Sequence, residues 1–282
     1  MHDMFCFTDI HGNKALFDAI MNFCKEQDDE ASIIFCGDAC DRGPDGYSIM
    51  KELLDNPHVL YLKGNHEDMF VNAARVVKEH FSDVPMERME PVLKSCMIYD
   101  GKYYDIRNSL YNGGLSTLMS WTKDGMPMDF VKEIDKLPYT FSTEFIDFCH
   151  SASLYKTFKT VADAEYEGKK VDEHAAYELI WNRSAIGFGW KADRTAVFGH
   201  TPVQHLNSFV KGINFDELAE PIGYTASKAT LKMYPDQTGT KIDLDVGTAY
   251  SKRAYVLNCL TGIAYGFEEK DNGVEKIGII SF

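Results

Sequence analysis

The sequence predicts an α/β protein in which two sheets are flanked by helices. Strand-like and helix-like segments alternate through the first third of the chain, which is typical of a parallel or mixed sheet with helices on its faces. A helix-rich segment follows, and a second strand-rich part begins near residue 139. Because no Pro/Ser-rich linker and no internal repeat interrupts this pattern, we expect one domain over residues 1–282 rather than two separable ones.

Short apolar segments at residues 4–8, 32–36 and 59–62 predict the first three strands. Apolar side chains recur between them at the spacing of a helix, first at Leu16, Ile20 and Phe23 and then at Tyr47, Met50 and Leu54. A polar turn at 28–30 and the Asn56-Pro57 pair are expected to end these two helices.

Residues 68–137 predict a helical insertion, with breaks expected at Pro85, Pro91, Gly113-Gly114 and Pro127. The second strand-rich part predicts strands at 139–142, 144–149, 195–199, 208–213, 241–246 and 254–260. One further helix is expected at 176–181.

The composition excludes several classes of function. The chain has 29 Lys and Arg against 43 Asp and Glu, so its net charge of −14 argues against general binding to nucleic acid or to an anionic membrane. No apolar run reaches the roughly 20 residues that a membrane span requires. The seven cysteines are odd in number and often lie in apolar segments, which favours buried thiols in a reducing cytoplasm. The oligomeric state stays open.

Polar residues capable of chemistry follow five of the predicted strands. Each of the first three strands ends in acidic or imidazole residues flanked by glycine, and two later strands end in a histidine. Ligands bind outside the carboxyl ends of strands in open α/β sheets, so these loops should meet at one site. The candidate site residues are Asp9, His11, Asp38, Asp41, Arg42, Asn65, His66, His150 and His200.

These side chains predict a metal site that acts on phosphate esters. Oxygen and nitrogen donors without a thiolate cluster suit Mn²⁺, Fe or Zn²⁺, and there are enough donors for two ions. Two ions can stabilise both the attacking and the leaving oxygen of an in-line displacement. Arg42 can bind a phosphoryl group with two parallel hydrogen bonds. The residues alone therefore favour metal-assisted hydrolysis of a phosphate ester.

The same loops resemble the motifs of the phosphoprotein phosphatase family. The segments similar to GDxHG, GDxxDRG and GNHE are Thr8-Asp9-Ile10-His11-Gly12, Gly37-Asp38-Ala39-Cys40-Asp41-Arg42-Gly43 and Gly64-Asn65-His66-Glu67. His150 and Gly199-His200-Thr201-Pro202 resemble the two downstream metal histidines, and Tyr111-Asn112-Gly113-Gly114 resembles a segment of the small bacterial and phage members. The resemblance covers nearly the whole chain. It implies a calcineurin-like metallophosphoesterase fold with two mixed sheets packed as a sandwich and flanked by helices.

The resemblance also implies a role for each residue. The ligands of two divalent ions, with Mn²⁺ the expected metal, would be Asp9, His11, Asp38, Asn65, His150 and His200. Asp38 would be shared by both ions. Arg42 would bind the phosphoryl oxygens, and His66, oriented by Asp41, would protonate the leaving alkoxide. The reaction would be direct attack by metal-bound hydroxide, without a phosphoenzyme.

Two further residues are expected to bind substrate, and one residue departs from the motifs. Arg183 resembles a second phosphate-binding arginine of the family. Lys63 stands where many members have arginine, so it keeps the charge but loses the planar fork. Thr8 replaces the first glycine of the first motif. Because a β-branched residue favours strand geometry, the first loop is expected to differ slightly from that of the family.

Two substrate classes remain open. The leading interpretation is a serine/threonine protein phosphatase whose partner is a phosphorylated protein. The alternative is a hydrolase of symmetrical diadenosine tetraphosphate or of another nucleotide. Asp41 and Glu67 favour the first, because the nucleotide hydrolases often lack the equivalent of Asp41 and end the third motif in Asp. A phosphatase-like binding module without activity is disfavoured, because every ligand position is filled.

Overall fold

Three parallel strands from the N-terminal part form half of the first sheet. The computed structural model describes the whole chain except residues 1, 99–100, 209–218 and 226–238. The apolar strands β1 (Met4–Phe7), β2 (Ser32–Phe35) and β3 (Val59–Tyr61) pair in parallel. They are connected by α1 (Lys14–Gln27) and α2 (Gly46–Asp55), which confirms the predicted alternation. Helix α1 begins where the Asn13 side chain accepts a hydrogen bond from the Leu16 N–H.

The C-terminal part of the chain completes this sheet with antiparallel strands. Strand β9 (Arg253–Asn258) pairs with β1, and β10 (Ile263–Lys270) and β11 (Gly273–Ser281) continue outward in the order β11-β10-β9-β1-β2-β3. The strand predicted at 254–260 is confirmed. Strands β10 and β11 are absent from the sequence prediction, because charged residues and glycines interrupt the apolar residues of both segments.

The second sheet has three parallel strands in its centre and antiparallel strands at both edges. It contains β4 (Thr140–Ser142), β5 (Ile146–Cys149), β6 (Thr195–Phe198), β8 (Thr240–Asp243) and β7 (Ile222–Thr225), in that spatial order. Four of these strands lie where the sequence predicts them. Strand β7 is not predicted. The strand predicted at 208–213 begins at Ser208, which ends the short helix η2 (Val203–Ser208), and its other residues lie outside the described part.

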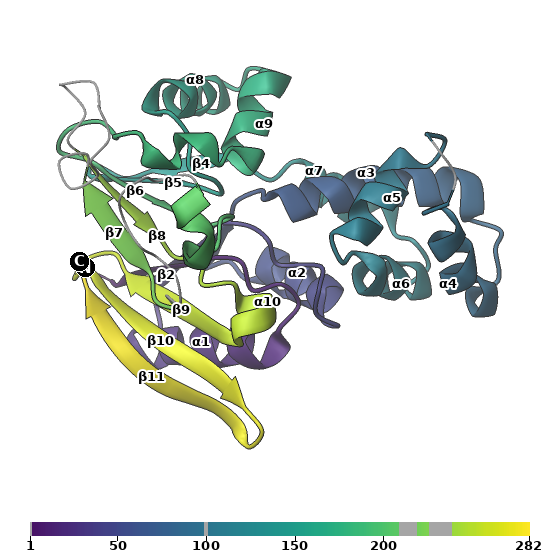
Figure 1. Cartoon of the computed structure of the whole chain (residues 1–282), viewed down its shortest axis with the longest axis horizontal. Helices are drawn as coiled ribbons and strands as arrows, with labels where there is room; N and C mark the ends of the chain where they lie inside the picture. The colour runs from purple at the N-terminus through teal and green to yellow at the C-terminus, as the bar shows by residue number, and fades with distance from the viewer. Residues whose placement is uncertain (1, 99–100, 209–218, 226–238) are drawn as a thin grey trace.

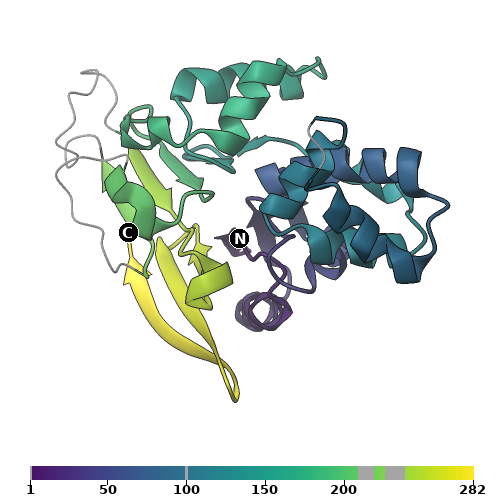
Figure 2. The ribbon, with the colours of Figure 1, turned by 45° about the vertical axis from the view of Figure 1, so that its right-hand side comes forward.

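The two sheets pack face to face, which confirms the predicted sandwich with helices around it. Buried side chains of both sheets share one core, among them Cys6, Ile34, Phe148, Val197 and Leu257. A second core lies between the first sheet and the helices that cover its other face. Figures 1 and 2 show the two sheets side by side, with the helices that follow β3 standing to one side of them.

The described residues between β3 and β4 in the sequence form five helices, which together make up the helical segment. They are α3 (Asn65–Phe81), α4 (Met86–Ser95), α5 (Tyr104–Tyr111), α6 (Leu115–Lys123) and α7 (Met128–Asp135). They project to one side of the molecule (Figure 1). Helix ends near Pro85, Gly113-Gly114 and Pro127 lie as predicted.

The break predicted at Pro91 is wrong, because Pro91 lies inside α4. A proline removes the hydrogen bond to the carbonyl four residues earlier, which here belongs to Glu87. Both Pro91 and Glu87 are exposed, so water can bind that carbonyl. The buried side chains of Met89 and Leu93 hold the helix against the core on both sides of the proline.

Helices α8 (Tyr155–Tyr166) and α9 (Glu173–Trp181) cover the outer face of the second sheet, and the helix predicted at 176–181 is therefore confirmed as part of α9. Two short elements complete the description, η1 (Ser184–Gly187) and α10 (Thr248–Ser251). In the described part of the chain, none of the helices has both the length and the apolar character needed to cross a membrane.

Candidate active site

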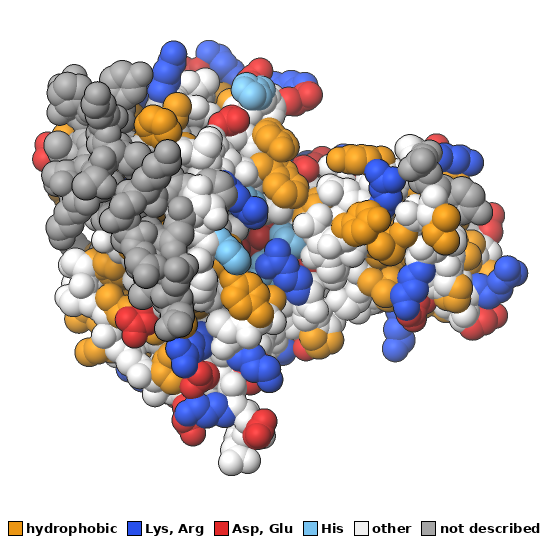
Figure 3. All heavy atoms as spheres, viewed as in Figure 1, with side chains coloured by type: hydrophobic (Ala, Val, Ile, Leu, Met, Phe, Trp, Pro, Cys, Tyr) orange, Lys and Arg blue, Asp and Glu red, His pale blue; other side chains and the backbone are white. Residues whose placement is uncertain are grey.

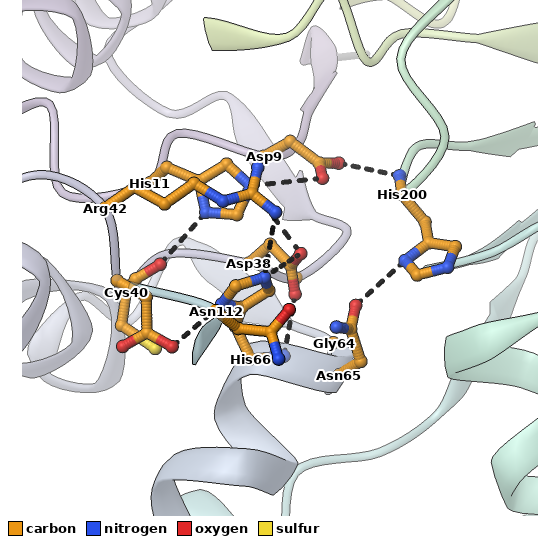
Figure 4. A network of polar contacts seen from close by, with 12 residues as sticks. Asp9, His11, Asp38, Cys40, Arg42, Gly64, Asn65, His66, Asn112 and His200 are labelled. Atoms are coloured by element: carbon orange, nitrogen blue, oxygen red, sulfur yellow. Dashed lines mark hydrogen bonds and ion pairs between the residues drawn. The ribbon is translucent and has the colours of Figure 1, made fainter. Parts of the chain in front are cut away.

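Loops at the ends of five strands meet at one buried site. Asp9 and His11 follow β1, Asp38, Asp41 and Arg42 follow β2, and Asn65 and His66 open α3 after β3. His150 and His200 follow β5 and β6 of the second sheet. The structure therefore brings together all nine residues that the strand ends supply in the sequence analysis. Figure 4 shows most of their side chains pointing toward a common centre.

The backbone of these loops is strained. In the described chain nine residues other than glycine have positive φ, and six of them belong to this site: Asp9, His11, Asp38, Asp41, Arg42 and His200. Such conformations cost energy and persist where the surrounding structure requires them, often at functional sites. The loops that carry the motifs therefore adopt backbone conformations that these residues disfavour on their own, and in doing so they turn the side chains toward the site.

Motif glycines allow these loops to approach one another closely. Gly37 has a φ of 93°, and a Cβ there would lie 2.7 Å from the Cα of Gly64. A Cβ on Gly199 would lie 2.6 Å from Cγ2 of Thr8, the residue that replaces a motif glycine. Thr8 compensates with a hydrogen bond of 2.6 Å from its hydroxyl to Oδ2 of Asp9, so Thr8 helps to orient a candidate ligand.

Three histidines are each held by a backbone carbonyl. Nδ1 of His11 lies 3.0 Å from Cys40 O, Nδ1 of His150 lies 2.7 Å from Cys36 O, and Nε2 of His200 lies 3.3 Å from Trp181 O. Metal-bound histidines usually donate their second ring N–H in this way, which fixes the tautomer and directs the other nitrogen to the metal. The remaining nitrogens of all three rings face the centre of the site.

The donors of the predicted second metal site converge on the Asn65 side chain. Its Oδ1 lies 3.0 Å from His150 Nε2 and 2.9 Å from His200 Nδ1, and His150 Nε2 is 3.3 Å from Asp38 Oδ1. Burial, followed by the charge of His150, holds the pKa of His200 well below its usual value. The neutral His200 ring has one proton for two acceptors, Asn65 Oδ1 and Trp181 O. If Nε2 donates that proton to Trp181 O, the lone pair of Nδ1 faces Asn65 Oδ1 without a proton between them, and a divalent cation there would bind both atoms.

The donors of the predicted first metal site are less tightly grouped. His11 Nε2 lies 3.8 Å from Asp9 Oδ1 and 3.8 Å from Asp38 Oδ2. Asp9 is anchored by its other oxygen, which accepts from the N–H of His200 at 3.0 Å. Two groups of described side chains have the geometry to hold an ion, namely His11, Asp38 and His66 and also Asp38, His150 and His200. Asp38 belongs to both, as expected of a shared ligand.

Arg42 contacts the candidate ligands directly. Its Nη1 lies 2.9 Å from His11 Nε2, and its Nη2 lies 3.2 Å from His66 Nε2. A guanidinium and a metal ion cannot use the same lone pair of His11, so an ion at this position requires the guanidinium to turn away. The amide N–H of Arg42 is held at 3.0 Å by Gly113 O from the helical insertion.

His66 and Asp41 form a buried pair. Nδ1 of His66 lies 2.8 Å from Oδ2 of Asp41, whose side chain is fully buried. Burial lowers the pKa of His66, but the charge of Asp38 and the hydrogen bond to Asp41 outweigh it, so the pKa is raised above its usual value. Nε2 of this ring faces the centre of the site, 3.7 Å from Asp38 Oδ2. The pair can therefore deliver a proton there.

Arg183 lies with Arg42 in one cavity, whereas Lys63 does not. A cavity of about 490 Å³ is lined by both arginines, His200, His205 and Tyr250. Lys63 is only 2% exposed, and its Nζ donates a hydrogen bond of 2.5 Å to the carbonyl of Asp135. The structure thus places the Lys63 ammonium against the end of α7 and not among the residues that line this cavity.

Glu67 has a function that the sequence analysis did not assign. Its carboxylate accepts hydrogen bonds from the N–H groups of Asp38, Ala39 and Gly64 and from the hydroxyl of Tyr61. It thereby fastens the second motif to the third. The signal in the sequence is the position of this glutamate in the first turn of α3, where a side chain can bind free backbone N–H groups.

The centre of the site suits cations, and its rim suits an anionic ligand. In the space-filling view, histidine and acidic side chains are visible in a hollow near the middle of the face, and Lys and Arg side chains stand at its rim (Figure 3). Oxygen and nitrogen donors with one shared carboxylate also fit two divalent ions. When bound, such ions would activate water and neutralise charge on a phosphoryl group.

Removing divalent metal is expected to lower the thermal stability of the protein. An ion that binds one site of the folded state, at a free concentration about 100 times its Kd, adds about 2.7 kcal/mol to the free energy of unfolding. For a chain of 282 residues that corresponds to about 5 °C in Tm for each ion. Calorimetry of protein stripped with a chelator, before and after addition of Mn²⁺, measures the difference. Equal melting temperatures would contradict a preformed metal site.

Metal affinity is expected to rise with pH. Burial lowers the pKa of His150, but the charge and hydrogen bond of Asp38 raise it to about 10 in the metal-free protein. Burial raises the pKa of Asp9 to about 6. Binding must displace the His150 proton, so affinity should increase about tenfold per pH unit above pH 6, and more steeply below it where Asp9 also binds a proton. Titration of Mn²⁺ at pH 5, 6, 7 and 8 tests this slope; a pH-independent affinity would refute it.

Comparisons with known proteins show the family to which the chain belongs. The family model for calcineurin-like phosphoesterases matches residues 4–220. No curated protein matched the chain. Solved structures with a similar course of the chain include a candidate diadenosine tetraphosphatase, with 14% identity, a TM-score of 0.46 and coverage of 98% of this chain and 93% of the other. Another is the cold-active protein-tyrosine phosphatase of a Shewanella species, with 14% identity, a TM-score of 0.46 and coverage of 99% and 81%.

A third is a protein serine/threonine phosphatase from Saccharomyces cerevisiae, with 14% identity, a TM-score of 0.45 and coverage of 100% and 80%. At these values the solved structures carry no information about the substrate of this chain. The family model covers well over half of the sequence, and its matched residues include the loops that carry all nine site residues. The chain belongs to the calcineurin-like phosphoesterase family.

Proposed function

We propose that this metallophosphoesterase is a protein phosphatase that removes phosphate from phosphoserine and phosphothreonine. The observation that carries the proposal is the buried pair of His66 and Asp41, joined at 2.8 Å. A serine or threonine alkoxide is a poor leaving group and needs a proton from a general acid. The phosphate chain of a nucleotide leaves as a stable anion and needs no such acid. An imidazole that is oriented by a buried carboxylate, as His66 is by Asp41, therefore favours an alkyl phosphate substrate.

The other residues have complementary roles in this proposal. Arg42 and Arg183 line the same cavity and bind the phosphoryl oxygens. His66 donates a proton from Nε2 to the leaving oxygen, and Asp41 keeps the ring oriented and stabilises its charge. Two divalent ions, for which we propose Mn²⁺, are held by Asp9, His11, Asp38, Asn65, His150 and His200. The partner is a phosphorylated protein, and the place of action that we propose is the cytoplasm.

Hydrolysis of diadenosine tetraphosphate is the second candidate, and one observation favours it. The cavity beside the two arginines has an aromatic wall in which the rings of His205 and Tyr250 lie 6.4 Å apart between centroids. Aromatic side chains stack on nucleobases, and the arginines can bind a phosphate chain. An adenosine could therefore fit where the first proposal places the peptide.

A comparison of substrates separates the two proposals. Protein stripped of metal and reconstituted with Mn²⁺ is assayed with a phosphothreonine peptide and with diadenosine tetraphosphate. We expect kcat/KM to be at least about tenfold higher for the peptide, which corresponds to about 1.4 kcal/mol in the transition state. The reverse preference would replace the first proposal by the second. No turnover of either substrate would contradict both.

A further inference from the structure

A lysine is fully buried in the second sheet. Lys241 lies on β8 and is 1% exposed. Among the described residues, no carboxylate forms an ion pair with its ammonium group, although buried lysines normally have such a partner. Burial lowers the pKa of Lys241 to about 7. A lysine in this position is costly, and an apolar side chain of the same length would fill the space more cheaply.

Lys241 instead binds two backbone carbonyls from different segments. Its Nζ donates to the carbonyl of Ala185 at 2.9 Å and to that of Ser153 at 3.3 Å. The ring of Trp190 lies on another side of the ammonium group, with its centroid 5.5 Å from Nζ. Lys241 therefore joins β8 to the loop that follows β5 and to the short helix η1.

Both of these segments carry residues of the active site. Ala185 lies in η1, which begins directly after Arg183, and the carbonyl of Arg183 accepts from the N–H of Ile186 within the same turn. Ser153 lies three residues after His150. The loop at Ser153 is tied to α9 by Ser151, whose N–H donates to Leu179 O at 2.9 Å. Lys241 thus connects η1 to a loop that is itself bound to α9.

The arrangement has a direct consequence for Arg183. The side chain of Arg183 lines the same cavity as Arg42. Arg183 directly precedes η1, so the position of η1 affects where its guanidinium lies. Asn182 fastens the start of this turn, since its Oδ1 accepts from the N–H of Ala185 at 3.0 Å. Lys241 holds the carbonyl of the same residue, Ala185, by donating a hydrogen bond to it. Removing this donor would take away the bond between η1 and β8, and the Ala185 carbonyl would keep the N–H of Phe188, at 3.0 Å, as a donor from within its own turn.

We propose that Lys241 is a positioning residue that sets Arg183 for phosphate binding. The proposal rests on the proposed role of Arg183 in the site. It does not depend on whether the natural substrate is a phosphoprotein or a nucleotide, because both present a phosphoryl group to the same arginine.

Competitive inhibition by inorganic phosphate tests this role. The Mn²⁺-reconstituted full chain is assayed with p-nitrophenyl phosphate as wild type, Lys241→Met, Arg183→Ala and the double variant. Loss of one hydrogen bond to a charged group predicts an inhibition constant about 10 to 100 times higher in Arg183→Ala. Lys241→Met should raise it about fivefold with little change in kcat. In the double variant the constant should equal that of Arg183→Ala, because Lys241 acts through Arg183.

Several outcomes would overturn the proposal. One is an unchanged inhibition constant in Lys241→Met, and another is a double variant in which the two effects multiply. If Arg183→Ala binds phosphate as wild type does, the role of Arg183 fails and the proposal fails with it, whereas the substrate comparison with peptide and nucleotide is unaffected.

Two further variants separate positioning from general loss of stability. Val77→Ala removes buried side-chain volume from α3, far along the helical segment, and should leave the inhibition constant unchanged. Lys241→Arg keeps donors for the two carbonyls and should return the constant to within about twofold of wild type. If Lys241→Met does not fold at the assay temperature, Lys241→Arg still tests the proposal. An inhibition constant in Lys241→Arg as high as that of Arg183→Ala would contradict a role based on hydrogen bonding.

Discussion

Asp38→Asn is expected to lower metal-dependent turnover by about a thousandfold or more. Asp38 is the one carboxylate that lies in both groups of potential metal ligands. The substitution keeps the shape of the side chain and removes the charge that both ions share. Metal ions supply several kcal/mol of transition-state stabilisation, and about 4 kcal/mol corresponds to three factors of ten in rate. Turnover and metal content are measured together on the reconstituted protein.

A second carboxylate near the site provides the matched control. Asp68 lies on α3 and accepts a hydrogen bond from the Asn72 side chain, but belongs to neither group of ligands. Asp68→Asn should retain two ions and activity within about twofold of wild type, as expected of a substitution outside the site. Near-normal activity of Asp38→Asn would show that Asp38 does not bridge the ions.

His66→Asn is expected to slow the release of alkoxide leaving groups far more than that of phenolates. General acids contribute about 10²- to 10⁴-fold to such reactions. Hydrolysis of a phosphothreonine peptide should fall by a factor in this range, because the threonine oxygen must leave with a proton. p-Nitrophenolate is stable as an anion, so hydrolysis of p-nitrophenyl phosphate should fall much less. The two substrates are compared by kcat at saturating concentration.

The metal content of the variant decides how the His66 result is interpreted. His66 also lies in a group that could hold an ion, with His11 and Asp38. If it is the general acid, His66→Asn keeps two ions per chain. Loss of one ion, together with equal losses on both substrates, would instead make His66 a ligand and remove the main support for an alkyl phosphate substrate.

The central part of the site can be predicted from the sequence because its chemistry lies at strand ends. The order of strand, loop and helix along the chain is enough to place Asp9, Asp38 and Asn65 at one edge of a sheet. The second sheet is harder, because His150 and His200 are separated by α8 and α9. Only the resemblance to a family assigns these two histidines to the same metal ion, and the structure brings both within 3.0 Å of Asn65 Oδ1.

Features that depend on packing between distant segments could not be predicted. Lys63 has the right charge and sequence position for a phosphate ligand, but its ammonium binds Asp135, which follows 72 positions later. Pro91 has the local preference of a helix breaker, yet the buried Met89 and Leu93 keep α4 intact. In both cases a tertiary contact decides the outcome, and a single sequence gives no sign of that contact.

The proposed reaction depends above all on two ions that bind on either side of Asp38. Crystals of the Mn²⁺-reconstituted protein, measured for anomalous scattering from manganese, test it directly. We expect two peaks, both beside Asp38. One should lie beside Asp9 and His11, and the other beside Asn65, His150 and His200. A single peak, or a first ion held by His66 in place of Asp9, would contradict it.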